Sequence, residues 1–228
     1  MKVLFVGSSL YQSSIDLSDL VVRPPASQGD VQQAVADGAT AIGLVDGEFG
    51  QHASVWHKEI LLALWRGVPV LGASSMGALR FAECAQFGMI GVGKIAADYA
   101  SGVLDDDADV ALLMAPAELS YAPLTEPLVD VVSTLDNLLL RGVLTKTQCA
   151  ALLRRARSLH FTERTDEVLF ESYPEGGDLL QSYRSYHVSQ KRLDAEELVS
   201  RLRSLDVGDW DLPHFTLNQS PFWSARTA

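Results

Sequence analysis

Short apolar segments alternate with helix-like segments along the first hundred residues, and this alternation limits the possible folds more than any other feature of the sequence. Helical patterns at about residues 29–37 and 54–66 separate the apolar runs. The runs themselves lie at residues 2–6, 20–22, 41–45 and 68–71. Continuous apolar strands alternating with helices indicate a parallel sheet that is covered on both faces. We therefore predict an α/β fold, a Rossmann-like parallel sheet with helices on both faces.

Beyond residue 100 the helical patterns dominate, so we predict a mainly helical C-terminal region. Helices are expected at about residues 126–141, from Thr145 and from Asp194, because the last two starts have the spacing of a capping box. The stretch from Trp210 to Trp223 is aromatic, and is either a tail packed on the body or a strip that binds a partner. The predicted organisation is an α/β core with the active-site loops (residues 1–120), a helical region packed on it (121–208) and an aromatic C-terminal tail (209–228).

Charge and cysteine content exclude several classes of function. The formal net charge of -11 argues against a nucleic-acid partner, because such proteins present basic surfaces to phosphates. Cys84 and Cys149 occur without a CxxC motif or a Cys/His cluster, so a disulfide scaffold or zinc site is not expected. The acidic run at residues 105–109 lacks the spacing of a calcium loop. No secretory segment or long apolar span is recognisable. We expect a cytoplasmic protein without a metal, a cofactor or a membrane partner.

Three distinctive loops follow predicted strands directly. They contain residues 7–9 (Gly-Ser-Ser), 46–49 (Asp-Gly-Glu-Phe) and 72–77 (Gly-Ala-Ser-Ser-Met-Gly). In an open parallel sheet the carboxyl ends of the strands lie at one edge, and ligands bind there at the point where the winding of the chain reverses. These loops are therefore expected to converge on one site.

The third loop resembles a nucleophile elbow, in which a sharp turn between a strand and a helix exposes a hydroxyl beside the first amides of the helix. Ser75 is central in this stretch, although Ser74 is an alternative nucleophile. The amides of Met76 and Gly77 would then stabilise an oxyanion. The competing interpretation is that Ser75 only caps the helix, a role that contributes about 1 kcal/mol.

The helix before this loop offers two candidate bases. If Ser54 is its N-cap, His57 and Lys58 lie in or beside the first turn, where burial and the helix dipole both favour the neutral form that a general base requires. Lys58 could instead pair with neighbours on the helix surface. Asp46 would either orient the base or form an Asx-turn. The catalytic hypothesis requires the base and the serine to share one water-poor crevice.

Several unusual short motifs occur in order along the chain. They are "PPASQGD", "GLVDGEFG", "VWHKEIL", "GASSMGALR", "FGMIGVGKI", "DDDADVA", "PLTEPLV" and "QKRLDAEEL", after an initial Gly7-Ser8-Ser9. In sequence and order these motifs resemble those of the TfuA-like family. The resemblance covers most of residues 1–205, with small departures at Ser8, where proline is expected, and at Ala108-Asp109, where an acidic pair is usual.

The resemblance implies an accessory role beside YcaO enzymes, which use ATP to activate a peptide backbone amide whose oxygen is then replaced by sulfur. A member of this family would hydrolyse the C-terminal thiocarboxylate of a ubiquitin-like sulfur-carrier protein and deliver sulfide to its YcaO partner, with a precursor peptide as a further partner. The alternative is a non-catalytic module that docks the YcaO enzyme or its peptide substrate. A nucleotide-binding role is disfavoured, since GxGxxG and GxxxxGK[ST] are both absent.

In that setting each candidate residue has an expected role. Ser75 would be the nucleophile, Lys58 the base, and Asp46 a group that orients the base, with Ser74 and His57 as the respective alternatives. The carrier's anionic terminus would be received by helix-terminal amides and by loop residues at the same edge. These substrate-binding and oxyanion candidates are Met76, Gly77, Arg80, Gly7, Ser8, Ser9, Gly47 and Glu48.

Overall fold

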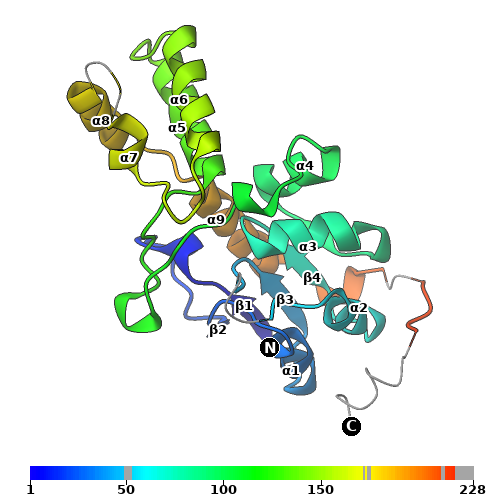
Figure 1. The fold of residues 1–228 in the computed structure, drawn as a ribbon. Coiled ribbons are helices and arrows are strands. Elements are labelled where there is room, and N and C mark those ends of the chain that lie inside the picture. The colour runs from blue at the N-terminus through cyan, green and yellow to red at the C-terminus, as the bar shows by residue number, and fades with distance from the viewer. Residues whose placement is uncertain (49–52, 172, 174–175, 212–213, 219–228) are drawn as a thin grey trace.

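A five-stranded parallel sheet forms the centre of the molecule in a computed structural model, which describes residues 1–48, 53–171, 173, 176–211 and 214–218 (Figure 1). Its strand order is β2-β1-β3-β4-β5. The strands are β1 (Lys2–Phe5), β2 (Val21–Arg23), β3 (Ala41–Leu44), β4 (Val70–Gly72) and β5 (Ile90–Gly91). The α/β prediction is confirmed, with β5 as an addition that the sequence pattern did not predict.

The helices follow the predicted order with shifted starts. The helix expected from residue 54 begins at His57, and the one expected from Asp194 begins at Gln190. The described helices are α1 (Asp30–Ala36), α2 (His57–Trp65), α3 (Met76–Cys84), α4 (Gly93–Ser101), α5 (Leu128–Leu140), α6 (Lys146–Ser158), α7 (Asp166–Phe170), α8 (Gly176–Ser185) and α9 (Gln190–Ser204).

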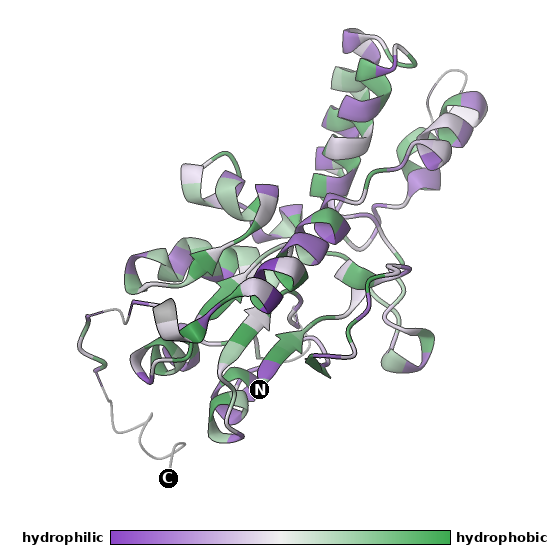
Figure 2. Cartoon of the chain, turned by 180° about the vertical axis from the view of Figure 1, so that it is seen from behind, coloured by the Kyte–Doolittle hydropathy of each residue, from purple (hydrophilic) through white to green (hydrophobic). Residues whose placement is uncertain are grey.

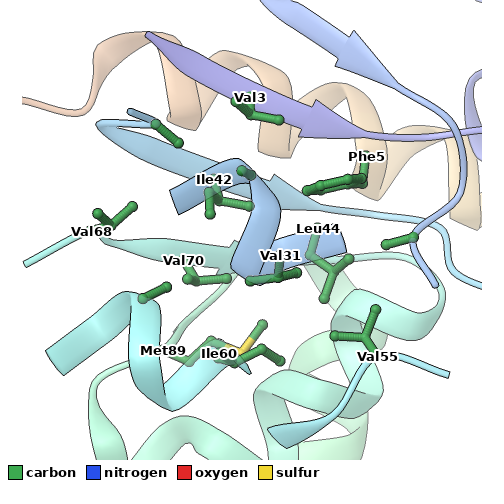
Figure 3. Close-up of a cluster of buried hydrophobic side chains, with 14 of the residues drawn as sticks. Val3, Phe5, Val31, Ile42, Leu44, Val55, Ile60, Val68, Val70 and Met89 are labelled. Carbon is green, nitrogen blue, oxygen red and sulfur yellow. The ribbon is translucent and has the colours of Figure 1, made fainter. Parts of the chain in front are cut away.

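Alternate side chains of the strands enter two apolar layers. Val3 and Phe5 of β1 and Ile42 of β3 point into a layer shared with α1 and α2 (Figure 3). Successive residues of a strand face opposite sides of the sheet. Leu4 accordingly enters the second layer, on the other face of the sheet.

Helix α9 covers that second face although it lies near the end of the chain. Its Ala195, Leu198 and Leu202 are buried against the strands, and seen from behind the helix carries both hydrophobic and hydrophilic residues (Figure 2). The approach is close at Gly43, where an added Cβ would lie 2.8 Å from Leu198 Cδ2. Packing of this helix on the sheet brings residues from positions 190–204 next to the loops of the first hundred residues.

Helices α5 to α8 stand away from the sheet and have an apolar cluster of their own (Figure 1). Leu135, Leu152 and Tyr183 lie at the centre of that cluster. The domain boundary at residue 120 remains a prediction. Part of the predicted tail, residues 212–213 and 219–228, lies outside the described residues, while Phe215 stacks edge-on against Phe87 at a centroid distance of 5.4 Å.

Neither cysteine is in a disulfide. Cys84 is buried and Cys149 is partly exposed. Throughout the part of the chain that the structure describes, the helices are too short or too polar to cross a bilayer.

Candidate active site

The loops after β1 and β3 meet at the point where the winding of the sheet reverses. Strand β1 pairs with β2 on one side and with β3 on the other, which creates the crevice where open parallel sheets bind ligands. Asp46, directly after β3, is 2% exposed and accepts hydrogen bonds from the backbone amides of Gly7 (2.8 Å) and Ser9 (2.9 Å). Ser9 Oγ donates to the same carboxylate at 2.6 Å. Asp46 therefore joins two of the predicted loops.

The third loop joins this cluster through Ser74. Ser74 has a φ of +66°, the left-handed conformation of a tight corner, which costs a non-glycine residue about 1 kcal/mol. Its Oγ lies 2.8 Å from Ser9 Oγ. Gly77 lets the first turn of α3 approach β3, because a Cβ there would stand 1.8 Å from the carbonyl oxygen of Leu44. The predicted convergence of the three loops is present.

Ser75 occupies the N-cap position of α3, yet its side chain makes no capping hydrogen bond. Its Oγ lies 3.1 Å from Nζ of Lys191, which projects from the first turn of α9. Ser75 itself is 2% exposed. The capping interpretation therefore does not describe this hydroxyl, whose partner is a lysine 116 residues away in the sequence.

Lys191 has the surroundings of a base that can be neutral. The residue is 2% exposed, and its Nζ also donates to the carbonyl oxygen of Val110 at 2.9 Å. Burial lowers the pKa of Lys191, while the charge of Asp46, at 4.0 Å, and that of Asp130 oppose this effect. A lysine with a lowered pKa beside a serine hydroxyl is a working arrangement for nucleophilic catalysis.

A cavity of about 190 Å³ leads to this group. Lys191 and Ser9 line it, and they contact Ser75 and Ser74 respectively. The other polar lining residues include two carboxylates, Glu126 and Asp130, as well as Ser8, Tyr11, Gln12, Thr125, His187, Ser189 and Arg192. A larger cavity, of about 760 Å³, is lined by residues of α4, α5 and the acidic run 105–109, and it contains none of the predicted site residues. The smaller cavity therefore reaches Lys191, whereas Asp46, Ser74 and Ser75 lie behind its lining.

The predicted bases of α2 lie in different surroundings. His57 Nε2 is 2.7 Å from the Glu83 carboxylate, with 51% of its side chain exposed. Arg80 binds the same carboxylate at 2.6 Å and donates to the carbonyl oxygen of Val55 at 2.8 Å. Lys58 follows His57 in the first turn of α2 and is partly exposed. The structure thus brings together Asp46, Ser9, Ser74 and Ser75, and the cation that contacts Ser75 Oγ is Lys191.

The remaining predicted residues shape the loops. Gly47 packs against Met76, because a Cβ there would lie 2.7 Å from Met76 Cγ, and the Glu48 amide donates to the carbonyl oxygen of Ala26 at 3.0 Å. The Gly77 amide donates to the carbonyl oxygen of Val45 at 3.1 Å, so this predicted oxyanion donor has a partner. Met76, as the first residue of α3, remains the candidate donor.

Sequence reasoning did not identify Lys191, although the sequence carried a signal for it. Lys191 shares one face of α9 with Ala195, Leu198 and Leu202, all of them buried. A charged residue in an otherwise apolar helix stripe is unusual and suggests a functional environment. Among the residues that the structure describes, no group of three His, Cys, Asp or Glu side chains is placed to hold a metal ion.

A family model described as TfuA-like protein matches residues 46–165 of the chain, just over half of its length. The matched segment begins at Asp46 and contains both serines of the corner, whereas Ser9 and Lys191 lie outside it. A search of curated proteins finds no match.

Proposed function

The chain belongs to the TfuA-like family, and we propose that it is a hydrolase that releases sulfide from the C-terminal thiocarboxylate of a ubiquitin-like sulfur-carrier protein. Membership of this family is consistent with a role in peptide thioamidation together with a YcaO enzyme. The observation that carries the hydrolase proposal is the contact of Ser75 Oγ with the buried amine of Lys191.

The first step is transfer of the carrier's acyl group to the enzyme. Neutral Lys191 takes the hydroxyl proton of Ser75, and Oγ bonds to the carbonyl carbon of the thiocarboxylate. The C–S bond then breaks, and the leaving sulfur receives the proton from Lys191 and departs as hydrosulfide. The carrier is left as an ester on Ser75.

The second step returns the Ser75 hydroxyl and the Lys191 amine to their starting states. Lys191 takes a proton from a water molecule, whose oxygen attacks the ester carbon. The bond to Ser75 Oγ breaks, and the lysine proton passes to that oxygen. The carrier leaves as a carboxylic acid that loses its proton to solvent, and no oxidant or reductant is consumed.

Charge stabilisation in both steps is assigned to the start of α3. The amide of Met76 lies at the positive end of this helix, next to the nucleophile, as an oxyanion donor should. The buried surroundings strengthen such an interaction, because little water competes for the developing charge.

We take the cavity that Lys191 lines as the substrate entrance, and its size fits a narrow, flexible chain end better than a folded surface. Its volume of about 190 Å³ accommodates only a few small residues, and its lining includes the basic residues His187 and Arg192 together with the carboxylates of Glu126 and Asp130. A C-terminal tail that extends from a folded carrier has this form. Its end would meet Lys191, which lines the cavity, and Ser75 Oγ lies 3.1 Å beyond the lysine amine.

Sulfide release from a purified thiocarboxylated carrier tests the proposal. Wild type should release sulfide without YcaO or ATP, whereas Ser75→Ala and Lys191→Met should lose at least about a thousandfold in rate. Lys94→Met is the matched control, because Lys94 is an exposed lysine that pairs with Asp98. Carrier binding is measured in parallel to show that the variants retain the surface that binds the carrier.

Docking without catalysis is the alternative. Undiminished sulfide release by Ser75→Ala would exclude the proposed nucleophile. If wild type bound the carrier or YcaO but released no sulfide, the docking role would be favoured.

A further inference from the structure

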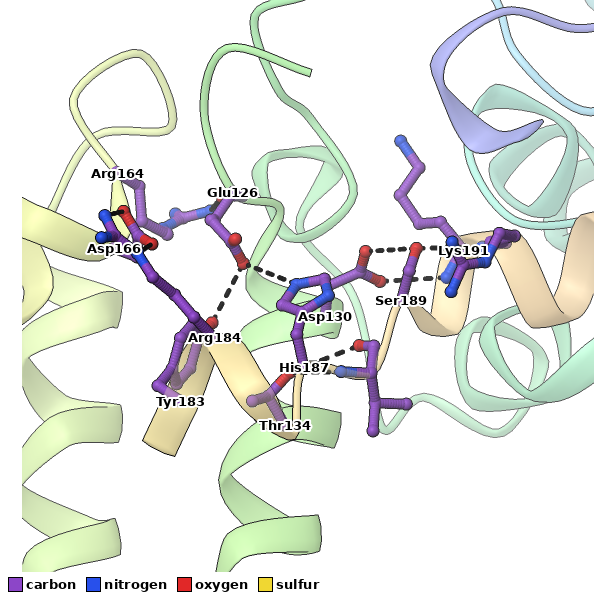
Figure 4. Close-up of polar contacts among 12 residues, drawn as sticks. Glu126, Asp130, Thr134, Arg164, Asp166, Tyr183, Arg184, His187, Ser189 and Lys191 are labelled. Atoms are coloured by element: carbon purple, nitrogen blue, oxygen red, sulfur yellow. Dashed lines mark hydrogen bonds and ion pairs between the residues drawn. The ribbon is translucent and has the colours of Figure 1, made fainter. Parts of the chain in front are cut away.

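Three polar residues at intervals of four hold the segment that leads into α9. Asp130 and Thr134 share one side of α5, and Glu126 lies just before that helix (Figure 4). Glu126 contacts His187 at 3.3 Å, and Thr134 Oγ1 accepts a hydrogen bond from the Val188 amide at 3.0 Å. The chain is therefore fixed at successive positions before it reaches Lys191.

Asp130 makes the contacts closest to the reacting groups. It is 4% exposed, and its carboxylate accepts hydrogen bonds from Ser189 Oγ at 2.8 Å and from the backbone amide of Lys191 at 2.9 Å. Ser189 caps α9 through the amide of Arg192. One buried carboxylate thus binds both the cap of α9 and the backbone of the residue whose side chain meets Ser75.

We propose that Asp130 is a positioning residue for the Ser75–Lys191 pair: it fixes the start of α9 so that Nζ meets Oγ, and its negative charge stabilises the proton that Lys191 takes from Ser75. The inference rests on the proposed function for its catalytic meaning. The anchoring contacts and the effect on the lysine are properties of the folded chain that can be measured without any substrate.

The charges around the pair come from three parts of the molecule. Lys191 faces Asp46 after β3 and Asp130 of α5. Asp130 in turn faces Glu126, while His187 and the buried Tyr183 lie within range of its charge. Burial raises the pKa of Asp130 to about 6, so it is ionised at neutral pH and can act on the lysine there. Its loss removes one of the two anions that favour protonated Lys191.

Direct titration of the lysine tests this inference in the full chain. The sequence has five lysines, so ¹³Cε labelling gives few signals, and the one missing in Lys191→Met identifies the residue. Asp130→Asn preserves the shape and an acceptor oxygen but removes the charge. We expect it to lower the titration midpoint of Lys191 by about one pH unit. The other lysine signals report whether the fold is retained.

Ser189→Ala is the matched variant, because it removes a contact to the anchor and leaves the charge. It should keep the midpoint of Lys191 within about 0.3 pH unit and reduce kcat for sulfide release severalfold with KM little changed. An unchanged midpoint in folded Asp130→Asn would overturn the electrostatic role. An unchanged kcat in Ser189→Ala would overturn the positioning role. If Asp130→Asn does not fold, Ser189→Ala still tests whether Asp130 positions the lysine.

The two proposals can fail separately. Absence of sulfide release by wild type would contradict the proposed function, while the lysine titration would still measure the effect of Asp130. Normal release by wild type with no effect of either variant would leave the proposed function intact and exclude Asp130 from it.

Discussion

Two polar groups near α3 contain the same kinds of side chains in opposite surroundings. The buried serine–lysine group consists of Ser9, Asp46, Ser74, Ser75 and Lys191, each at most 2% exposed. The surface histidine group consists of His57, Arg80 and Glu83, whose side chains are 14 to 51% exposed. Both place a basic residue beside a carboxylate, but only the first also includes a serine hydroxyl and a cavity.

Burial is what separates their chemistry. Exposed ion pairs are screened by water and contribute about 0 to 1 kcal/mol, so the surface histidine group mainly connects α2 to α3. In the buried group, loss of hydration lowers the pKa of Lys191 and makes its neutral form accessible. A base is therefore identified better by its surroundings than by its distance from the nucleophile along the chain.

Replacement of Lys191 should have the largest effect, because it removes the proposed base while leaving the proposed nucleophile in place. Lys191→Met should lower kcat/KM for sulfide release by about a thousandfold or more. A double variant with Ser75→Ala should be no slower than the worse single variant, because the two residues act as a unit. Additive losses in the measured rates would show that they act separately.

The charge of Asp130 should appear in the pH dependence of stability. Burial raises its pKa from 3.8 to about 6, so the folded state holds the proton more tightly than the unfolded chain. The stabilisation that protonated Asp130 gives the folded state is therefore fully present below about pH 4, and it is lost as the pH rises through about 6. The free energy of unfolding of wild type, relative to Asp130→Asn, should fall by about 2 kcal/mol between pH 4 and 6, and by about 3 kcal/mol in all once the pH is well above 6.

Urea unfolding at several pH values measures this difference. The comparison with Asp130→Asn removes the contributions of the other carboxyl groups that titrate in the same range. Parallel curves for the two proteins would contradict the burial of an ionised Asp130.

Asp46→Asn should weaken the fold itself. An amide keeps one acceptor oxygen for the Gly7 and Ser9 amides, but it is uncharged and presents its NH₂ group to Ser9 Oγ. The charge-assisted hydrogen bonds therefore become neutral ones and the Ser9 hydroxyl must reverse its direction. We expect a loss of about 2 kcal/mol in the free energy of unfolding. Asp206→Asn is the matched control: this exposed carboxylate accepts one amide hydrogen bond, from Gly208, and its loss should cost about 0.5 kcal/mol or less. Equal losses in the free energy of unfolding for the two variants would mean that the contacts of Asp46 to the loop of Gly7 and Ser9 stabilise the fold no more than an exposed hydrogen bond does.

The surface histidine group should give the smallest effect. His57→Gln removes a contact to Glu83 that is half exposed, so sulfide release should stay within about twofold of wild type and stability within about 1 kcal/mol. A loss as large as that of Lys191→Met would restore α2 as the source of the base.

The fold was predictable from the sequence where local patterns determine it. The apolar runs defined β1 to β4, and their carboxyl ends placed Ser9, Asp46 and Ser75 at one edge. Strand β5 has only two residues and is held by pairing with β4, so no periodicity could indicate it. The predicted Ser54 cap was wrong, because Ser54 Oγ donates to the carbonyl oxygen of Glu48 and α2 begins at His57.

Lys191 was beyond local reasoning for a different reason. Lys191 reaches Ser75 only because α9 returns to cover the sheet after the whole α5–α8 region. That return is a tertiary packing event, and no spacing within the first hundred residues encodes it. A buried lysine on the apolar stripe of α9 was the available signal, and its partner required the structure.

Trapping the acyl intermediate tests the central claim most directly. A rapid-quench reaction of wild type with thiocarboxylated carrier, followed by peptide mapping by mass spectrometry, should find the carrier's C-terminus joined as an ester to Ser75, and Ser75→Ala should form no such ester. An ester on another residue, or sulfide release by Ser75→Ala at the wild-type rate, would contradict the account.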